Sequence, residues 1–389
     1  MKNGWKKIKN ITAGLKDLTT IGIAEIVGNT ISAIFWLYIA TILGAGDYGQ
    51  ISYFLAIAGI ASGISLLGAE NVLTVYIAKN IKIEPPVYFL TIIFGTLSSL
   101  VLFMTFQNLG ASVLAFGSVI IGLGTSELLG RKLYVAYSKY LIIQRILMMG
   151  LAIGFYHLIG TNGVILGVAL AFIPYVIRIY RGIIGSKIDF SLIRTHSSFI
   201  IHSYVLRLSG MFSGMADKII IAPLLGYTIL GNYQLAVQIL NILQIFPFIV
   251  FKYTLPQDAS GHTSKKLKKA TVFISIGLSI LVITIFPIIA PVLFPKFSHV
   301  IEAAQITSLS IIPASVSIMY MSEFLGNEKS KIVIMSSGIY VAVQITGIIL
   351  LGKIFGINGI AFALLLAQSS QAVFLFSASR ITRERTNKV

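Results

Sequence analysis

Residues 44 to 49 are GAGDYG, which fits the pattern G-x-G-x-x-G of loops that hold the pyrophosphate of a dinucleotide. Glu70 follows at roughly the separation at which an acidic side chain would bind the ribose. The pattern has this meaning only when a short strand precedes it inside a soluble βαβ unit. A long apolar run precedes it here, so we predict a tight turn between two membrane helices.

No other residues have the spacing of a catalytic or metal site. The chain has no cysteine, which excludes thiolate nucleophiles, zinc–cysteine sites and iron–sulfur clusters. Its 5 histidines form no H-E-x-x-H pattern or comparable ligand pair. The loops predicted outside the membrane are short and leave no room for an acceptor-binding domain. We therefore expect that the protein is not an enzyme and uses no cofactor or metal.

The composition is that of a membrane protein. Of the 389 residues, 56% are hydrophobic and 11% are charged, whereas soluble domains carry about 25% charged residues. The mean hydropathy is +0.89. A chain this apolar cannot cover itself with a polar surface, so lipid must be its solvent.

Twelve apolar segments are long enough to cross a bilayer, which takes about 20 residues each. They lie at 18–43, 48–68, 86–107, 110–128, 141–160, 163–182, 197–222, 229–251, 270–294, 301–322, 332–351 and 358–378. These segments predict an all-α, polytopic membrane protein with about 12 transmembrane helices.

The net charge of +17 follows the predicted topology. With Met1 inside, the inner segments and adjoining helix ends hold 26 of the 30 lysines and arginines, and the outer loops hold Lys296 and Lys353. This bias places both termini in the cytoplasm and the chain in the cytoplasmic membrane as a multi-pass protein. The runs KKIKN and KKLKK are then topology signals that contact anionic membrane lipids, and nucleic acid is not a partner.

Two sequence echoes indicate an internal repeat. LGAGDYGQISYF at 43 matches LGYTILGNYQLA at 225, an offset of 182, and GTNGVILGVALA at 160 matches GINGIAFALLLA at 356, an offset of 196. They predict two pseudo-symmetric six-helix lobes, 1–190 with spans one to six and 191–389 with spans seven to twelve. Transporters built from parallel repeats place their substrate between the halves and rock one against the other.

The first hairpin and the seventh and eighth spans also resemble a known family. A leucine-glycine turn, a Tyr-Gly pair and an Ala-Asp-basic triplet are similar to those of the polysaccharide (Wzx-type, lipid-linked oligosaccharide) flippases of the MOP exporter superfamily. The matching residues are Leu43, Gly44, Tyr48, Gly49, Ala216, Asp217, Lys218, Leu225, Gly226 and Gly231.

This resemblance implies a MOP-type bundle that moves a lipid-linked glycan outward. The cargo would be an oligosaccharide on a polyprenyl (pyro)phosphate, translocated by alternating access for cell-surface polysaccharide or glycan biosynthesis. Its partners would be the lipid-linked glycan, membrane lipids and other glycan-assembly proteins.

Charged residues inside the spans are the candidate substrate-binding residues, because such groups tend to face a cavity. The offset of 182 carries Glu25 onto Arg207. Glu25 shares a helix face with Asn29, and Arg207 shares one with Lys218, about 16 Å away along the helix. We expect Arg207 to bind phosphate bidentately, Lys218 to hold it further outward, and Glu25 to neutralise Arg207 when the site is empty. The alternative is a structural Glu25–Arg207 pair, or side chains that snorkel to the interface.

The eighth span adds a narrow polar stripe of Gln234, Gln238 and Asn241, which lines the cavity or hydrogen-bonds between helices. A MATE-like cation-coupled antiporter of small molecules or drugs is the alternative function, and it would use a buried carboxylate, Glu25 or Asp217. A membrane enzyme or a non-transporting scaffold subunit also remains open. Anionic cargo needs buried cations and a cationic drug needs buried carboxylates, and the spans contain both.

Overall fold

The computed structural model describes residues 2–183, 188–260 and 264–386, and the side chains of the first 18 residues, including KKIKN, lie outside the described set. Within these ranges the chain forms α-helices, turns and bends but no β-strand. The helices are α1 (Lys2–Ile42), α2 (Ala45–Ser65), α3 (Ala69–Ala78), α4 (Glu84–Phe106), α5 (Leu109–Gly130), α6 (Tyr134–Ile159), α7 (Thr161–Leu170), α8 (Ile173–Ile183), α9 (Ser191–Thr195), α10 (Ser197–Leu225), α11 (Tyr227–Ala259), α12 (Lys265–Leu293), α13 (Val300–Leu309), α14 (Ile311–Gly326) and α15 (Ser330–Thr386).

Helices occupy all twelve predicted segments. In the described residues, 9 helices are long and apolar enough to cross a membrane, or up to 10 if α2 and α3, which bend by 48°, form one span. α15 covers the last two predicted spans, since Gly356 interrupts it with φ 58° and ψ −132°. α10 extends from Ser197 to Leu225 and so includes the whole predicted seventh span, 197–222. The prediction of an all-α, polytopic membrane protein is confirmed.

The chain forms two compact units whose boundary crosses helices. The first unit contains Met1–Phe35 and Phe54–Met211, and the second contains Trp36–Tyr53 and Phe212–Val389. The end of the first span and the start of the second therefore belong to the second unit, because they pack against its helices. The predicted division into lobes at residue 190 stays a prediction.

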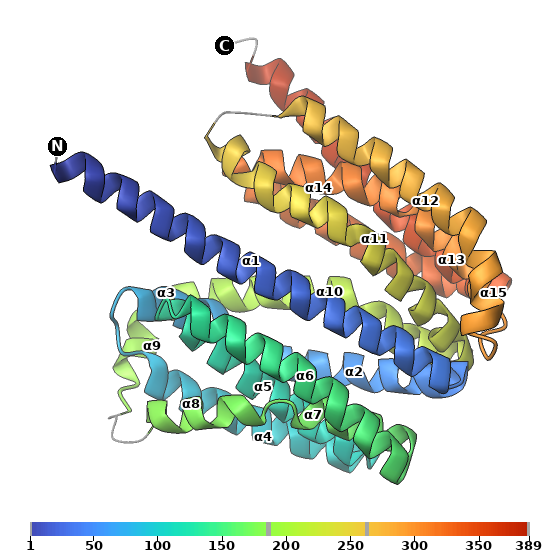
Figure 1. The fold of residues 1–389 in the computed structure, drawn as a ribbon, viewed down its shortest axis with the longest axis horizontal. Helices are drawn as coiled ribbons and strands as arrows, with labels where there is room; N and C mark the ends of the chain where they lie inside the picture. The colour runs from blue at the N-terminus through green and yellow to red at the C-terminus, as the bar shows by residue number, and fades with distance from the viewer. Residues whose placement is uncertain (1, 184–187, 261–263, 387–389) are drawn as a thin grey trace. The chain divides into compact units, whose positions relative to one another are not determined.

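The first unit is built around α5, which packs against α3, α4 and α7 (Figure 1). α5 is the most buried of the candidate spans, because 67% of its most apolar stretch is buried inside the protein. Small residues recur along its sequence and allow neighbouring helices to approach closely. A hydrophobic core cluster of this unit includes Leu123 of α5, Leu73 of α3 and Tyr175 of α8.

The second echo in the sequence has a counterpart in backbone conformation. Gly160 has φ 70° and ψ −147°, and Gly356, its repeat mate, has φ 58° and ψ −132°. Side-chain-bearing residues rarely adopt positive φ, so a glycine is required at both points. The predicted fifth and sixth spans are thus separated in the same way as the predicted eleventh and twelfth.

Candidate functional site

The GAGDYG segment is part of a helix rather than a nucleotide-binding loop. Only Leu43 and Gly44 separate α1 from α2, and the amide of Tyr48 already donates to the carbonyl oxygen of Gly44. The prediction that the glycines form a turn is therefore correct for Gly44 alone. Gly49 lies inside α2 and needs another explanation.

That explanation is a close contact within the second unit. A Cβ atom on Gly49 would lie 1.9 Å from the carbonyl oxygen of Tyr227, and one on Gly231 would lie 1.8 Å from that of Ala45. Both pairs of positions are related by the offset of 182, so the contact is reciprocal, as at an interface with two-fold symmetry. The glycines allow the backbones of α2 and α11 to touch.

A second residue matched to the family, Tyr48, also has a packing role. Its side chain is buried, with ring centroids 6.3 Å from Trp36 and 5.8 Å from Phe297, both edge-on. Edge-on aromatic contacts of this kind stabilise beyond the area they bury. The Tyr-Gly pair therefore holds the start of α2 in place.

Arg207 of α10 forms its ion pair in the first unit with Glu70 of α3. Its Nη1 lies 2.9 Å from Glu70 Oε2, and the two side chains are 39% and 29% exposed. The Arg207 Nε atom is buried and has no hydrogen-bond partner among the residues that the structure describes. Glu25 interacts electrostatically with Tyr137 of α6, and its pairing with Arg207 stays a prediction.

Lys218 is bound to its own neighbour in the second unit. Asp217 Oδ1 accepts a hydrogen bond from the Lys218 amide at 2.9 Å, and the Lys218 Nζ atom lies 3.2 Å from the same oxygen. Asp217 Oδ2 accepts from the Tyr233 hydroxyl at 3.2 Å. The carboxylate is buried, so the ammonium of Lys218 supplies its counter-charge.

The remaining predicted site residues range from half-buried to exposed. On α11, Gln234 and Gln238 are half-buried and Asn241 is exposed. Within the described part of the chain, the buried Gln234 Oε1 atom has no hydrogen-bond partner. Asn29 on α1 is exposed. Their predicted role in lining a cavity stays a prediction.

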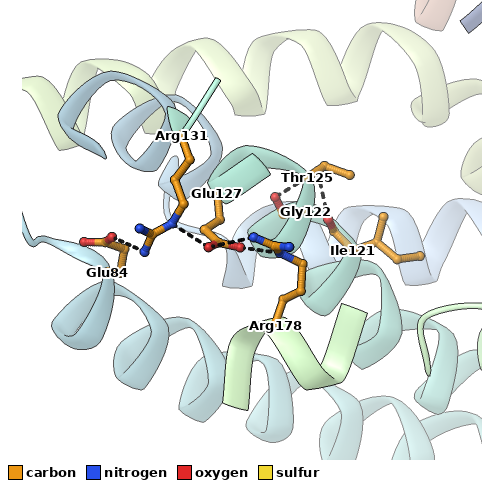
Figure 2. Close-up of polar contacts among 7 residues, drawn as sticks. All are labelled: Glu84, Ile121, Gly122, Thr125, Glu127, Arg131 and Arg178. Atoms are coloured by element: carbon orange, nitrogen blue, oxygen red, sulfur yellow. Dashed lines mark hydrogen bonds and ion pairs between the residues drawn. The ribbon is translucent and has the colours of Figure 1, made fainter. Parts of the chain in front are cut away.

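An ion-pair network around two buried carboxylates in the first unit was not predicted from the sequence. Figure 2 shows the Glu127 carboxylate between two guanidinium groups, with Glu84 on the far side of Arg131. Arg131 Nε donates to Glu127 Oε1 at 2.6 Å, and Arg178 Nε donates to Oε2 at 2.7 Å. Arg131 Nη2 also donates to Glu84 Oε1 at 3.1 Å.

The network joins the start of α4, the end of α5 and α8. The two carboxylates and two guanidinium groups of the network balance in charge, so the network offers no surplus charge to a cargo. By the predicted topology, these helix ends all lie on the inner side of the membrane, where arginines also act as topology signals. Glu127 and Arg131 are spaced i, i+4, a signal in the sequence that predicts their pairing.

The fold and these contacts define the class: an all-α, multi-pass membrane protein. By sequence, no known family and no curated protein matches the chain. Solved structures do match. One is the inward-facing conformation of a multidrug resistance MATE family transporter of the MOP superfamily, with a TM-score of 0.72 and 14% identity over 96% of this chain and 100% of that one.

Two further structures have the same arrangement of helices. The lipid II flippase MurJ, inward closed, has a TM-score of 0.68 and 15% identity over 92% of this chain and 87% of that one. An outward-facing MATE family transporter has a TM-score of 0.62 and 15% identity over 96% and 97%. The chain therefore has the fold of the MATE transporters and of MurJ, and identities this low say nothing about its cargo.

Proposed function

We propose that this protein is a flippase that moves a polyprenyl-(pyro)phosphate-linked oligosaccharide across the cytoplasmic membrane by alternating access, for cell-surface polysaccharide or glycan biosynthesis. Its termini lie in the cytoplasm. The internal repeat, the reciprocal contact of Gly49 with Gly231, and a fold shared with a lipid flippase support this function. The family resemblance of the first hairpin supplies the class of cargo.

One observation favours this cargo over a cationic drug. In the described residues, every buried carboxylate forms an ion pair with a lysine or arginine of the same unit. These acids are Glu84, Glu127, Asp217 and Asp258, and Asp258 lies 2.6 Å from Lys268 Nζ. A cationic cargo that bound one of these carboxylates would have to displace its internal cation.

The second candidate is a cation-coupled antiporter like the MATE transporters. The TM-score of 0.72 with a MATE transporter and the buried Asp217 favour it. In that case Asp217 would bind the coupling cation, which requires the Lys218 ammonium to leave it.

Purified protein in vesicles distinguishes them. The flippase makes a lipid-linked oligosaccharide on the far leaflet accessible to an added glycosidase, and protein-free vesicles do not. The antiporter is tested with a cationic dye as its cargo, and a sodium or proton gradient drives the dye's transport. Dye transport without glycan translocation would overturn the proposed function.

Arg207 is tested in the same assay. If its guanidinium binds phosphate, Arg207→Ala abolishes translocation at normal protein abundance and Arg207→Lys restores only part of it. A Glu70→Arg/Arg207→Glu swap then stays inactive, whereas a purely structural pair predicts that the swap restores transport. Arg181→Ala, which removes an exposed cation elsewhere in the same unit, is the matched control.

A further inference from the structure

Arg145 of α6 is a cation of the first unit that lies at membrane depth without an acidic partner. It is half-buried and lies four residues inside the predicted fifth span, 141–160. Every other buried or half-buried cation of the predicted spans forms an ion pair with a carboxylate, and these cations are Arg178, Arg207 and Lys218. Among the described residues, Arg145 therefore carries the one span charge that no ion pair neutralises.

The side chain of Arg145 packs against α1 of the same unit. A Cβ atom built on Gly28 would lie 3.6 Å from Arg145 Cγ, so the α1 backbone covers the apolar stem of the arginine. Helical side chains lean toward the N-terminus of their helix, and the guanidinium interacts electrostatically with Tyr137, eight residues earlier on α6. By the predicted topology, the guanidinium thus reaches back toward the inner surface, to the depth of the lipid headgroups.

Two polar groups at this place have no partner. In the described part of the chain, Arg145 Nε and the Tyr175 hydroxyl oxygen of α8 are both buried and form no hydrogen bond. Tyr175 and Tyr137 are the groups that interact electrostatically with the guanidinium, and no carboxylate is among them. Tyr175 is 0% exposed, and its ring is fixed by a contact with Tyr140 at 5.3 Å between centroids.

An anion satisfies both the charge and the hydrogen bonds. A buried donor without an acceptor is costly, so an acceptor oxygen at this place is stabilising. A cation in a medium of low dielectric constant also needs a counter-charge. Phosphate supplies several strong acceptor oxygens and negative charge, and guanidinium binds it bidentately. At the depth of the headgroups, the phosphate within reach is that of a lipid.

We propose that Arg145 binds the phosphate of the lipid-linked cargo in the inner leaflet, with the Tyr175 hydroxyl as a second donor. The proposal rests on the proposed function, because that function supplies a lipid phosphate as cargo. Arg145 can take up this phosphate without losing an acidic partner. The Arg207 guanidinium, in contrast, is already bound to Glu70.

Displacement of a fluorescent farnesyl pyrophosphate from the purified full-length protein tests the site. Arg145→Met keeps the apolar stem, removes the charge and should weaken binding at least about tenfold. Arg145→Lys should restore part of the affinity, because it keeps the charge but not the bidentate fork. Tyr175→Phe should weaken binding about threefold. Lys139→Met removes an exposed cation from the same helix and, as the matched control, should change binding less than about twofold.

The melting temperature of the ligand-free protein separates a binding role from a structural one. Arg145→Met and Tyr175→Phe each remove a buried group that has no partner, so both should melt no lower than the wild type. A lower melting temperature for Arg145→Met would show that the arginine stabilises the fold, and unchanged binding would show that it does not contact the ligand. Either result would overturn the proposal.

Three competitors identify the ligand. Farnesol, inorganic pyrophosphate and phosphatidylglycerol should each displace the probe at least about tenfold more weakly than unlabelled farnesyl pyrophosphate. Equal displacement by phosphatidylglycerol would make this a general headgroup site and overturn its role in cargo binding.

The vesicle assay distinguishes failure of this proposal from failure of the proposed function. Glycan translocation that persists unchanged in Arg145→Met would refute the role of Arg145 and leave the proposed function standing. Binding of farnesyl pyrophosphate that depends on Arg145, in a protein that does not translocate lipid-linked glycan, would uphold the site and refute the proposed function.

Discussion

Replacing Gly49 with alanine should weaken the protein at the contact between α2 and α11. The new methyl group would lie 1.9 Å from the carbonyl oxygen of Tyr227, where an ordinary contact needs more than 3 Å. The two backbones must therefore separate by more than about 1 Å, a form of overpacking that costs about 1–3 kcal/mol. Alanine is itself the better helix former by about 0.5–1 kcal/mol, which offsets part of this cost.

Gly46→Ala is the matched control on the same helix. Its methyl group would lie 3.5 Å from the Thr228 Oγ1 atom, an ordinary contact, so only the gain in helix propensity remains. Gly231→Ala should behave like Gly49→Ala, because the contact is reciprocal. The Gly49→Ala/Gly231→Ala variant should lose less than the two single variants together, since the helices need to separate only once.

The assay is denaturation of the purified protein in detergent, with all four variants measured under the same conditions. From the most to the least stable, we expect the order Gly46→Ala, wild type, Gly49→Ala and the Gly49→Ala/Gly231→Ala double variant. A Gly49→Ala protein as stable as the Gly46→Ala protein would refute the close contact, and strict additivity in the double variant would refute its reciprocity.

Three shorter predictions test the topology and the ion pairs. A reporter fused at Lys266 should read cytoplasmic and one at Lys353 external, and an external signal at Lys266 would contradict the twelve-span arrangement. Glu127→Gln removes the charge between two partly exposed arginines and should cost about 1–3 kcal/mol of stability; an unchanged melting temperature would exclude a structural role for the network. Lys218→Met leaves the Asp217 carboxylate buried without a counter-charge, so it should be less stable than Asp217→Asn/Lys218→Met; the reverse order would show that Lys218 does not neutralise Asp217.

The features that the sequence predicted are those that depend on local composition and backbone geometry. Apolar length defines a span because the bilayer has a fixed thickness, and helices occupy every predicted segment. The repeat offset of 182 also related Gly49 to Gly231, since both glycines are needed where two backbones touch. Positive φ at Gly160 and Gly356 follows from the second echo in the same way.

The partners of charged side chains could not be predicted in this way. Pairing Arg207 with Glu70 depends on how α3 rotates after the break at Leu67 and Gly68, where both residues have positive φ. That rotation is set by packing against α5 and α10 and not by the sequence spacing of the two charges. The repeat offset relates Arg207 to Glu25 because the two residues occupy equivalent positions in the two copies of the repeat. Residues at equivalent positions need not be in contact.

The direction of charge movement tests the proposed cargo most directly. An inside-negative potential of 100 mV favours outward movement of a pyrophosphate with about two negative charges by roughly 2.3 kcal/mol per charge. In vesicles whose lumen corresponds to the cytoplasm, at constant pH, we expect outward translocation of a polyprenyl-pyrophosphate-linked oligosaccharide to accelerate when the lumen is made negative and to slow when the potential is collapsed. Export of a cationic dye against its gradient, with no movement of the lipid-linked oligosaccharide at any potential, would contradict the proposed function.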